Sequence, residues 1–480
     1  MAENSSKQSH MLTKVEQRGL EPVPDDQRNG TPGQLFWVWF AANISILGIP
    51  LGATLISLGL NVWQSVLVTA IGSFGSFALV GIISVAGRRG GAPSLGLSRA
   101  IFGVRGNIGP AVVALCSRLG WETVNTITGA FALLSLWAII FKTPVTAKEA
   151  PGLVLAFILI FVVLTIIVAV AGHGFILKIQ KWATWIFGAL TLLVAGYLAA
   201  TVDWSLVLSG KPGSLSAVLI GIGTIAAGTG IGWVNSGADM ARYQKKDVKT
   251  SSLIWSAAAG AGIPLVLVIT VGAILTAGGS GIASAADPVI AVRDQLPAWV
   301  SVPYLISAFA GLLMCNSQSV YSAGLATLAT GIRIPRTVAV VVDVVVTTAG
   351  ALYFTLGFDG FYGPFITFIS LLSVPLAAWT GIFLVDMIDR RTYDGDSLVD
   401  LSPRSRYWYA AGFNVSGCVS WVVAFIVGYL FVTARVSADE VWFSGPLAGT
   451  FIGKNGLAWL VTMLLAAGIY AAWGGARSKE

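Results

Sequence analysis

GIGTIAAGTGIGWVNSGAD, residues 221–239, is an apolar segment that contains Gly228, Gly230, Gly232 and Gly237. Glycine weakens a helix because the backbone loses more conformational freedom there than at other residues. Four glycines so close together predict that a helix over this segment is interrupted. Glycine also lets neighbouring helices pack closely, so close packing without a break is the alternative.

A second interruption lies far upstream, in NISILGIPLGAT at residues 43–54. Gly48, Pro50 and Gly52 fall close together in this segment, and proline cannot donate the backbone hydrogen bond of a helix. The two segments together predict two broken helices, one near each of these glycine clusters.

The composition indicates where these helices reside. Of the 480 residues, 55% are hydrophobic and only 11% are charged, whereas about a quarter are charged in a water-soluble domain. Residues 153–170 and 457–473 are uncharged, and a helix needs ~20 apolar residues to cross a ~30 Å hydrocarbon core. We therefore predict an all-α integral membrane protein, because backbone polar groups in lipid must be satisfied within each segment.

Twelve segments are long and apolar enough to be membrane spans. They cover residues 34–60, 63–87, 107–140, 151–172, 175–201, 214–237, 252–278, 297–329, 337–357, 361–387, 407–433 and 448–474. The two predicted breaks fall in the first and sixth spans, which are corresponding positions in two five-span halves. Broken helices in this relation are typical of inverted repeats that form a binding site near the middle of the membrane.

The spans divide the chain into successive units. We expect a first inverted repeat over residues 34–201, a second over residues 214–387, and two additional spans over residues 407–474. Residues 1–33 are polar and contain prolines among charged residues. We expect them to form a flexible cytosolic tail, and residues 475–480 to form a second cytosolic tail.

The basic residues indicate how the spans are oriented. An even number of spans places both termini on one side of the membrane, and most of the 29 lysine and arginine residues fall on that side. Those expected on the opposite side are Lys142, Lys148, Lys211, Arg293, Arg435 and Lys454. Because cytoplasmic loops carry an excess of lysine and arginine, both termini are predicted to be cytoplasmic, in a plasma (inner) membrane. Orientation thus explains the net charge of +7, and nucleic-acid binding is not expected.

The third span carries polar groups at its centre, in RLGWETVN at residues 118–125. Arg118, Trp121, Glu122 and Asn125 share one face of a helix, and ionisable groups at this depth usually face a cavity or a partner. Arg118 and Glu122 either neutralise each other or leave Glu122 free to take up a proton. Trp121 and Asn125 supply a flat aromatic face and an amide, which suit a planar heterocycle.

The sixth span places a second polar set directly after its glycines, formed by Trp233, Asn235, Ser236 and Asp239. An unwound backbone near Gly230 would add N–H and C=O groups for a ligand. Tryptophan also favours membrane interfaces, but the glycines around Trp233 favour a binding site. Asp239 either organises the cytosolic end of the span or acts as a gate.

The eighth and ninth spans contain the remaining polar groups. Asn316 and Gln318 belong to NSQS, residues 316–319, in an otherwise apolar helix. They either join helices by hydrogen bonds or complete the binding site. Asp343 is an isolated acid in the ninth span, where it either relays protons or pairs with Arg336.

GWETVN at residues 120–125, GWVNSGADMARYQ at 232–244 and NSQSVYSAGLATLATGI at 316–332 resemble the nucleobase:cation symporter-1 family, in its purine–cytosine permease branch. The resemblance covers most of the chain, from the broken first helix to the tenth span. It implies the LeuT-like fold, in which two inverted five-helix repeats are followed by two more helices. It also implies import of cytosine, purines or related planar rings together with a coupling cation.

The resemblance extends to single residues. Trp121 and Asn125 resemble the stacking tryptophan and the hydrogen-bonding amide of the third span. Trp233 resembles the tryptophan six residues before the aspartate of the sixth span in fungal members. Asn316 and Gln318 resemble the polar residues of the eighth span that face the base.

The coupling ion is where this chain departs from part of the family. Sodium-dependent members place hydroxyl groups in the eighth span near the broken first helix, and here the matching positions hold Met314 and Cys315. Sulfur is a poor ligand for sodium, so coupling to protons is expected, with Glu122 and Asp239 as candidate acids. Arg118 and Glu122 stand where relatives often have other residues, which leaves their roles open. The alternative is a sodium-coupled transporter of a hydantoin, allantoin, thiamine or another vitamin.

Other classes of protein fit the sequence less well. The three cysteines and two histidines predict no disulfide framework, metal site or cofactor. Ser280 lies between glycines, but a serine nucleophile needs a base and His173 is far away in sequence, so no enzyme is expected. A channel would need a continuous pore. The expected partners are a small-molecule nucleobase, a coupling cation and membrane lipid, with no obligate protein partner and no preference among the bases.

Overall fold

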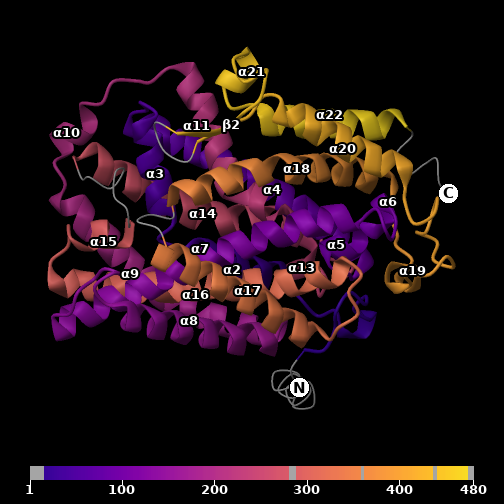
Figure 1. Ribbon diagram of the computed structural model, residues 1–480, viewed down its shortest axis with the longest axis horizontal. Helices are drawn as coiled ribbons and strands as arrows, with labels where there is room; N and C mark the ends of the chain where they lie inside the picture. Colours follow the sequence, from indigo (N-terminus) through magenta and orange to yellow (C-terminus); the bar gives the residue numbers. More distant parts are fainter. Residues whose placement is uncertain (1–15, 280–287, 358–361, 436–439, 474–480) are drawn as a thin grey trace.

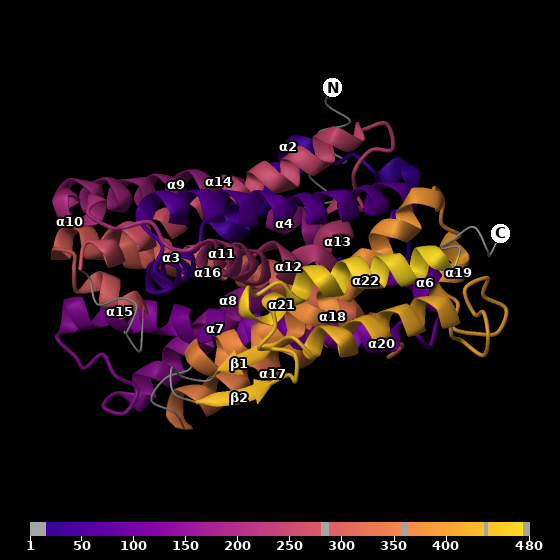
Figure 2. The same ribbon diagram turned by 90° about the horizontal axis from the view of Figure 1, so that it is seen from above.

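The computed structural model describes most of the chain. The described residues are 16–279, 288–357, 362–435 and 440–473. Ser280 and the expected tail at 475–480 lie outside them. Long helices run side by side along the longest axis of the molecule (Figure 1, Figure 2).

The helices follow the order expected from the sequence. Those of the first half are α2 (Pro32–Asn43), α3 (Gly48–Ser57), α4 (Val62–Gly90), α5 (Ser94–Leu97), α6 (Arg99–Phe102), α7 (Ile108–Phe141), α8 (Pro151–Ala171), α9 (His173–Thr201) and α10 (Trp204–Leu208), preceded by the 3-10 turn η1 (Asp25–Gln27). Those of the second half are α11 (Leu215–Gly228), α12 (Gly230–Trp233), the 3-10 turn η2 (Val234–Ser236), α13 (Gly237–Ala241), α14 (Thr250–Ala277), α15 (Pro288–Arg293), α16 (Ala298–Ala329), α17 (Arg336–Gly357) and α18 (Tyr362–Asp389). The C-terminal part contains α19 (Gly395–Val399), α20 (Val415–Tyr429), β1 (Thr433–Arg435), β2 (Val441–Ser444), α21 (Phe451–Lys454) and α22 (Ala458–Ala472).

The first span is broken, as predicted. Helix α2 ends at Asn43, residues 44–47 are not helical, and α3 continues at an angle of 64°. Gly48 begins α3 and Pro50 lies in its first turn, where proline is tolerated because the first N–H groups of a helix have no helical partner. The glycine–proline cluster therefore marks the start of the second helix, and the break lies just before it.

The sixth span is also broken, at Thr229. This residue separates α11 from α12 with φ −127° and ψ −104°, and the chain then passes through one turn of α12 and the turn η2 before α13. The Thr229 hydroxyl donates to the Ile225 carbonyl at 2.6 Å and so ends α11. Gly228 and Gly230 flank the break, which confirms the prediction from the glycine cluster.

The membrane helices pack in two groups. Helices α2, α3, α4 and α11–α14 form the first group, in which α4 and α14 have the most extensive contact. Helices α7, α8, α16 and α17 form the second group, with α16 packed along α7. The broken spans therefore belong to one group, and the polar faces of α7 and α16 belong to the other.

Two glycines bring α3 and α14 into direct backbone contact. A Cβ atom at Gly52 would collide with the Ile269 carbonyl of α14, and a Cβ at Gly272 would collide with the Ile49 carbonyl of α3. Each helix therefore needs glycine where the other approaches, as in other closely packed membrane helices.

The count of twelve spans stays a prediction. Among the described residues, nine helices are long and apolar enough to cross a membrane, and the bent pair α2–α3 would make a tenth. The last two expected spans correspond to α20 and α22, which have 15 residues each. Such a helix is only about 22 Å long, shorter than the ~30 Å core. The antiparallel hairpin of β1 and β2 lies between them and was not expected from the sequence.

The N-terminal segment is more ordered than the sequence suggested. Gly30 N–H donates to the Tyr243 carbonyl at 2.8 Å, and Arg28 donates to the carbonyls of Val23 at 2.8 Å and Arg88 at 3.1 Å. The expectation of a flexible tail over residues 1–33 is therefore wrong for residues 16–33, which pack against the helices. Residues 1–15 lie outside the described part.

Candidate functional site

The polar face of α7 is buried between the two groups of helices. Arg118 is 1% exposed, Glu122 and Asn125 are 0% exposed, and Trp121 is half-buried. The four residues share one face as the spacing predicted, so the question is what each of them contacts.

Arg118 reaches across to the break of the sixth span. Its Nη2 donates to the Gly232 carbonyl, and its guanidinium lies 4.2 Å from the ring centroid of Trp233. In the described part of the chain, no N···O distance of 4.0 Å or less joins Arg118 to Glu122. The expected neutralising pair on α7 is therefore not formed, and Arg118 instead joins the third span to the sixth.

Gly232 is in close contact with the α7 face. A Cβ atom at this position would stand 3.3 Å from Trp121 Nε1 and 3.9 Å from Arg118 Nη2. The indole N–H of Trp121 therefore lies at the unwound turn of the sixth span, and a larger residue at Gly232 would push it away.

Trp233 is buried, at 8% exposed, so its alternative assignment to the membrane interface is wrong. Its ring meets the ring of Trp39 on α2 edge to face, with centroids 5.5 Å apart and planes at 77°. Trp39 comes four residues before the end of α2, so aromatic rings link the two broken spans beside Arg118.

Asn125 and Asn316 form a chain of amides between α7 and α16. Asn125 Nδ2 lies 3.4 Å from Asn316 Oδ1 and 3.9 Å from Cys315 Sγ. Asn316 Nδ2 donates to the Thr165 hydroxyl of α8 at 3.2 Å. The structure therefore brings together Asn125 and Asn316 as expected, and adds Thr165, which holds the orientation of the Asn316 amide.

Gln318 faces another helix. Its Oε1 accepts from Gln180 Nε2 of α9 at 3.2 Å. Gln318 and Asn316 are two residues apart, which is about 200° around a helix. The printed contacts therefore place Gln318 at the junction of α16 with α9, and its predicted direct role in binding is not supported by a contact to the α7 set.

The acids predicted to carry coupling lie in different surroundings. Glu122 Oε1 accepts from the Ser319 hydroxyl of α16 at 3.1 Å. Asp239 Oδ1 accepts from the backbone N–H of Ser94 at 2.8 Å, and Ser94 Oγ accepts from Ala238 N–H at 2.9 Å. Asp239 thus fastens α13 to the start of α5, whereas Glu122 belongs to the buried face of α7.

Asp343 is held by α16. Its two carboxylate oxygens accept from the Thr327 hydroxyl at 2.9 and 3.2 Å. Arg336 donates instead to backbone carbonyls of Glu16, Ala169 and Val170. Among the described residues no ion pair joins Asp343 to Arg336, so that alternative is wrong.

The Gly230 backbone holds the break of the sixth span against α4. Its N–H donates to Ser76 Oγ of α4 at 3.2 Å, and a Cβ there would collide with Ser76. The N–H of Gly230 is therefore already bonded to α4 in this structure, and the predicted binding role of Gly230 stays a prediction.

Several buried polar atoms in this region have no hydrogen-bond partner in the described part of the protein. They are Arg118 Nε and Nη1, Glu122 Oε2, Asn125 Oδ1, Asn235 Nδ2 and Trp39 Nε1. Buried polar groups in folded proteins are nearly always hydrogen-bonded. The set therefore offers donors and acceptors to a small polar molecule at the meeting point of the two breaks.

The eighth span faces the first break with both hydroxyl and sulfur side chains. Ser307 lines a cavity together with Ile44 and Ile46. At Gly311 a Cβ atom would stand 2.9 Å from the Ile44 carbonyl, and Met314 and Cys315 follow one turn later. Within the described ranges, no group of three His, Cys, Asp or Glu residues could hold a metal ion. Met314 and Cys315 offer sulfur, whereas sodium prefers oxygen ligands, and coupling to protons stays a prediction.

Known proteins are similar in sequence to this chain. Residues 22–459 match the model of a family described as permease for cytosine/purines, uracil, thiamine, allantoin. The chain belongs to this permease family. The resemblance drawn from the three motifs is confirmed.

Two relatives illustrate how far the similarity extends. The candidate purine–cytosine permease YxlA of Bacillus subtilis is 27% identical over 477 residues, which cover 95% of this permease and 95% of the relative. The purine-cytosine permease fcyB of Emericella nidulans is 25% identical over 460 residues, covering 90% of this permease and 83% of the relative. Both relatives are named as permeases and not as enzymes.

Solved structures share the fold of the permease. Mhp1, a nucleobase-cation-symport-1 family transporter in a closed conformation with bromovinylhydantoin bound, matches with a TM-score of 0.72 at 21% identity, over 97% of both chains. A Na+-coupled sialic acid symporter matches with a TM-score of 0.61 at 12% identity, over 98% of this chain and 97% of that one. The permease is thus a multi-pass membrane transporter with the expected LeuT-like fold.

Sequence reasoning missed several residues that contact the predicted set. They include Trp39, Thr165, Gln180, Ser76 and Ser94. Thr165 had a signal, since it is the single hydroxyl residue in the apolar run 153–170. The others become partners only through the packing of distant helices.

Proposed function

We propose that this permease imports a nucleobase, cytosine or a purine, across the plasma membrane by proton symport. The observation that carries the proposal is the buried set of unpartnered donors and acceptors beside Trp121 and Trp233, where the two helix breaks meet. A nucleobase is flat and carries donors and acceptors along its edge, so it needs both an aromatic face and polar groups. The names of the relatives as purine–cytosine permeases support the same class of substrate.

In the proposed complex the ring stacks on Trp121. The guanidinium of Arg118 already covers one face of Trp233, so the substrate meets only the remaining surface of that indole. Stacking on an aromatic side chain is worth about 1–3 kcal/mol per base and tolerates different bases. Trp121 therefore supplies affinity, and the polar groups around it supply selectivity.

The edge of the ring is recognised by polar groups of α7 and the sixth span. Asn125 Oδ1 accepts from a ring N–H or an exocyclic amino group, while Arg118 Nε or Nη1 donates to a ring carbonyl or nitrogen. Asn316 orients the Asn125 amide, because Asn316 Oδ1 accepts a hydrogen bond from Asn125 Nδ2 and leaves Asn125 Oδ1 for the substrate. A base that bonds to both Arg118 and Asn125 therefore carries a hydrogen-bond acceptor next to a hydrogen-bond donor on one edge of its ring.

Glu122 is the proposed proton carrier. It is buried, it receives one hydrogen bond from Ser319, and its second oxygen has no partner in the described residues. A charged carboxylate at this depth is costly unless it is paired, and proton binding removes the charge. Loading from outside, rocking of one group of helices against the other, and release inside complete the cycle. Asp239 is the second candidate, because it lies on the same broken span.

The test is uptake into cells that lack their own nucleobase permeases. Labelled cytosine, adenine, guanine and hypoxanthine are supplied, and saturable uptake of at least one of them is expected. Uptake should stop with a proton uncoupler and should not depend on external sodium. The substrate proposal fails if only a hydantoin, allantoin or thiamine is taken up, and the coupling proposal fails if uptake requires sodium.

Sodium-coupled transport of a related heterocycle is the competing function. It is kept because Mhp1 binds a hydantoin and shares the fold. Met314 and Cys315, which offer sulfur instead of oxygen one turn after Gly311, weigh against it.

A further inference from the structure

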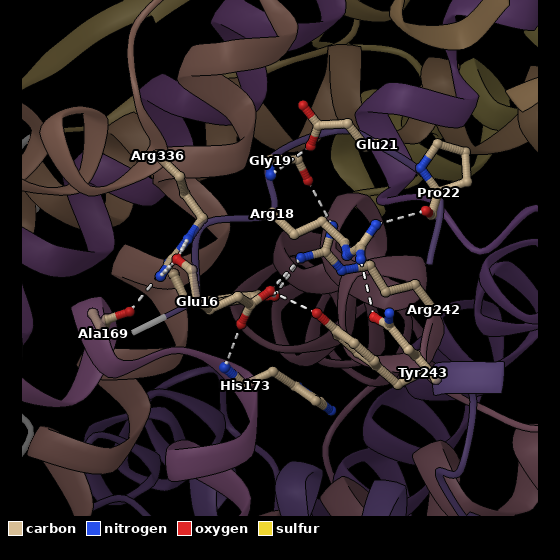
Figure 3. Close-up of polar contacts among 12 residues, drawn as sticks. Glu16, Arg18, Gly19, Glu21, Pro22, Ala169, His173, Arg242, Tyr243 and Arg336 are labelled. Carbon is tan, nitrogen blue, oxygen red and sulfur yellow. Dashed lines mark hydrogen bonds and ion pairs between the residues drawn. The ribbon is translucent and has the colours of Figure 1, made fainter. Parts of the chain in front are cut away.

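The N-terminal segment, residues 16–31, inserts an acid between the ends of the membrane helices (Figure 3). Glu16 Oε1 accepts from Arg242 Nη2 at 2.7 Å, from the Tyr243 hydroxyl at 2.7 Å and from the Tyr321 hydroxyl at 3.0 Å. Glu16 Oε2 accepts from the backbone N–H of His173 at 2.7 Å. The four donors come from three segments of the chain, because Arg242 and Tyr243 are neighbours.

Two arginines also hold the backbone of this segment. Arg242 Nη1 donates to the Gly19 carbonyl at 2.6 Å, and Arg336 donates to the Glu16 carbonyl through Nε at 3.1 Å and Nη2 at 2.8 Å. Arg336 also reaches the carbonyls of Ala169 and Val170 at the end of α8. The segment is thus tied at its side chain and at its main chain (Figure 3).

These contacts connect the two groups of helices. Arg242 and Tyr243 directly follow α13, which belongs to the group that contains the broken spans. Tyr321 lies on α16 and Arg336 begins α17, both in the other group, and His173 begins α9. Glu16 therefore bridges helices that must separate at this end when one group rocks against the other.

The bridge is strong because it is charged and shielded from water. The Arg242 side chain is 0% exposed and the Glu16 side chain 13% exposed. Burial would raise the pKa of the Glu16 carboxyl, but the nearby Arg242 and Arg336 guanidinium groups and the His173 N–H outweigh burial and lower it to about 2. The carboxylate is therefore charged at every physiological pH, and charge-assisted hydrogen bonds are about twice as strong as neutral ones.

We infer that Glu16 is a latch that keeps this end of the permease closed and that must release before the site opens toward it. The distribution of lysine and arginine predicts that this end is cytoplasmic. Glu16 is thus a positioning residue for the transport cycle, acting through the helices it joins and not through the substrate. The inference goes beyond the proposed substrate and ion, and its test needs neither of them.

Cys315 provides a native reporter of opening. Its Sγ lies 3.9 Å from Asn125 Nδ2, at the centre of the candidate site, and the chain has only two other cysteines, Cys116 and Cys418. In a Cys116→Ser, Cys418→Ser background, the rate at which a charged, membrane-impermeant maleimide alkylates Cys315 in inside-out vesicles reports access from the latched end. Melting of each purified variant in detergent checks that it is folded.

Glu16→Gln should raise the alkylation rate about tenfold, since a hydrogen bond to a charged group is worth roughly 1.5–3 kcal/mol and 1.4 kcal/mol is tenfold. Tyr243→Phe removes one donor and should raise the rate about threefold, which keeps the test valid if Glu16→Gln does not fold. Asp25→Asn is the matched control, because Asp25 is an acid of the same segment that makes no contact with Arg242, Tyr321 or Arg336 among the described residues. Its side chain is 64% exposed and pairs with Lys246 and with Arg28 of the same segment. This substitution should leave the rate unchanged.

The latch is refuted if Glu16→Gln and Tyr243→Phe both alkylate at the rate of the unmodified protein. It is equally refuted if Asp25→Asn raises the rate as much as they do, because a general loosening of the segment would then explain the result. A rise confined to Glu16→Gln and Tyr243→Phe, with unchanged melting, supports it.

Discussion

Asn125→Ala should weaken nucleobase binding about tenfold and also destabilise the protein, for two separate reasons. The substitution removes Oδ1, the acceptor without a protein partner among the described residues, and one lost hydrogen bond costs roughly 0.5–1.5 kcal/mol of binding. It also takes the donor away from Asn316 Oδ1. That buried oxygen is then unpaired with or without substrate, which lowers the free energy of unfolding by roughly 1–3 kcal/mol but leaves the affinity untouched.

Two controls separate these effects. Thr165→Val removes the acceptor of Asn316 Nδ2 and should cost similar stability, while Asn125 keeps its free oxygen and affinity changes little. Thr123→Val removes a hydroxyl on α7 that bonds to the Leu119 carbonyl at 2.8 Å, and should change neither property. Equilibrium binding of labelled cytosine and guanine to purified protein, with thermal melting, provides both readouts. Binding by Asn125→Ala that equals that of the unmodified protein would refute the proposed role of its oxygen.

Three further predictions concern acids in different surroundings. Glu122→Gln keeps the shape of the side chain but cannot take up or release a proton. Uptake should therefore no longer be faster at acid pH, while exchange of substrate across the membrane persists. An unchanged pH profile of uptake would show that Glu122 does not couple protons to transport. The pKa of Glu16 in the folded protein is about 2, below its ordinary value of 4.5, so the stabilisation by Glu16 is present above about pH 4.5 and is lost as the pH falls through 2. The difference in melting temperature between the unmodified protein and Glu16→Gln should therefore be constant from pH 5 to 8. A smaller difference at pH 5 than at pH 8 would contradict this. Asp386→Asn should destabilise the protein by about 3–5 kcal/mol, since it leaves the buried Arg390 without its partner at 2.7 Å and loosens Tyr470; a melting temperature equal to that of the unmodified protein would show that this pair contributes nothing.

The broken helices were predictable because their cause is local. Glycine and proline act on the backbone wherever they stand, so Gly48, Pro50 and Gly228 indicated both interruptions. The first break lies just before Gly48 and not at the glycine–proline cluster itself, because proline in the first turn of a helix is tolerated. The sequence does not say on which side of Pro50 the helix lies. Span length at α20 and α22 was overestimated because apolar residues continue into a hairpin and loops.

The candidate site was predictable only in part. Helical spacing correctly placed Arg118, Glu122 and Asn125 on one face, because that follows from the period of a helix. Helical spacing could not predict that Arg118 bonds to the Gly232 carbonyl instead of Glu122, because a long side chain can reach partners on helices that are far away in sequence. Charge and composition likewise suggested a free N-terminal tail, because nothing local marks Glu16 as the partner of two distant arginines.

The backbone contact of α3 with α14 at Gly52 and Gly272 determines how the first span can be observed. Most of α3 is buried, so a spectroscopic label attached to it would disturb the packing. On α14, Ile263 is 48% exposed and can carry a label with little effect. The backbones of α3 and α14 are in direct contact and leave no room for a side chain between them. A distance measured from a label at position 263 therefore reports the movement of the first span.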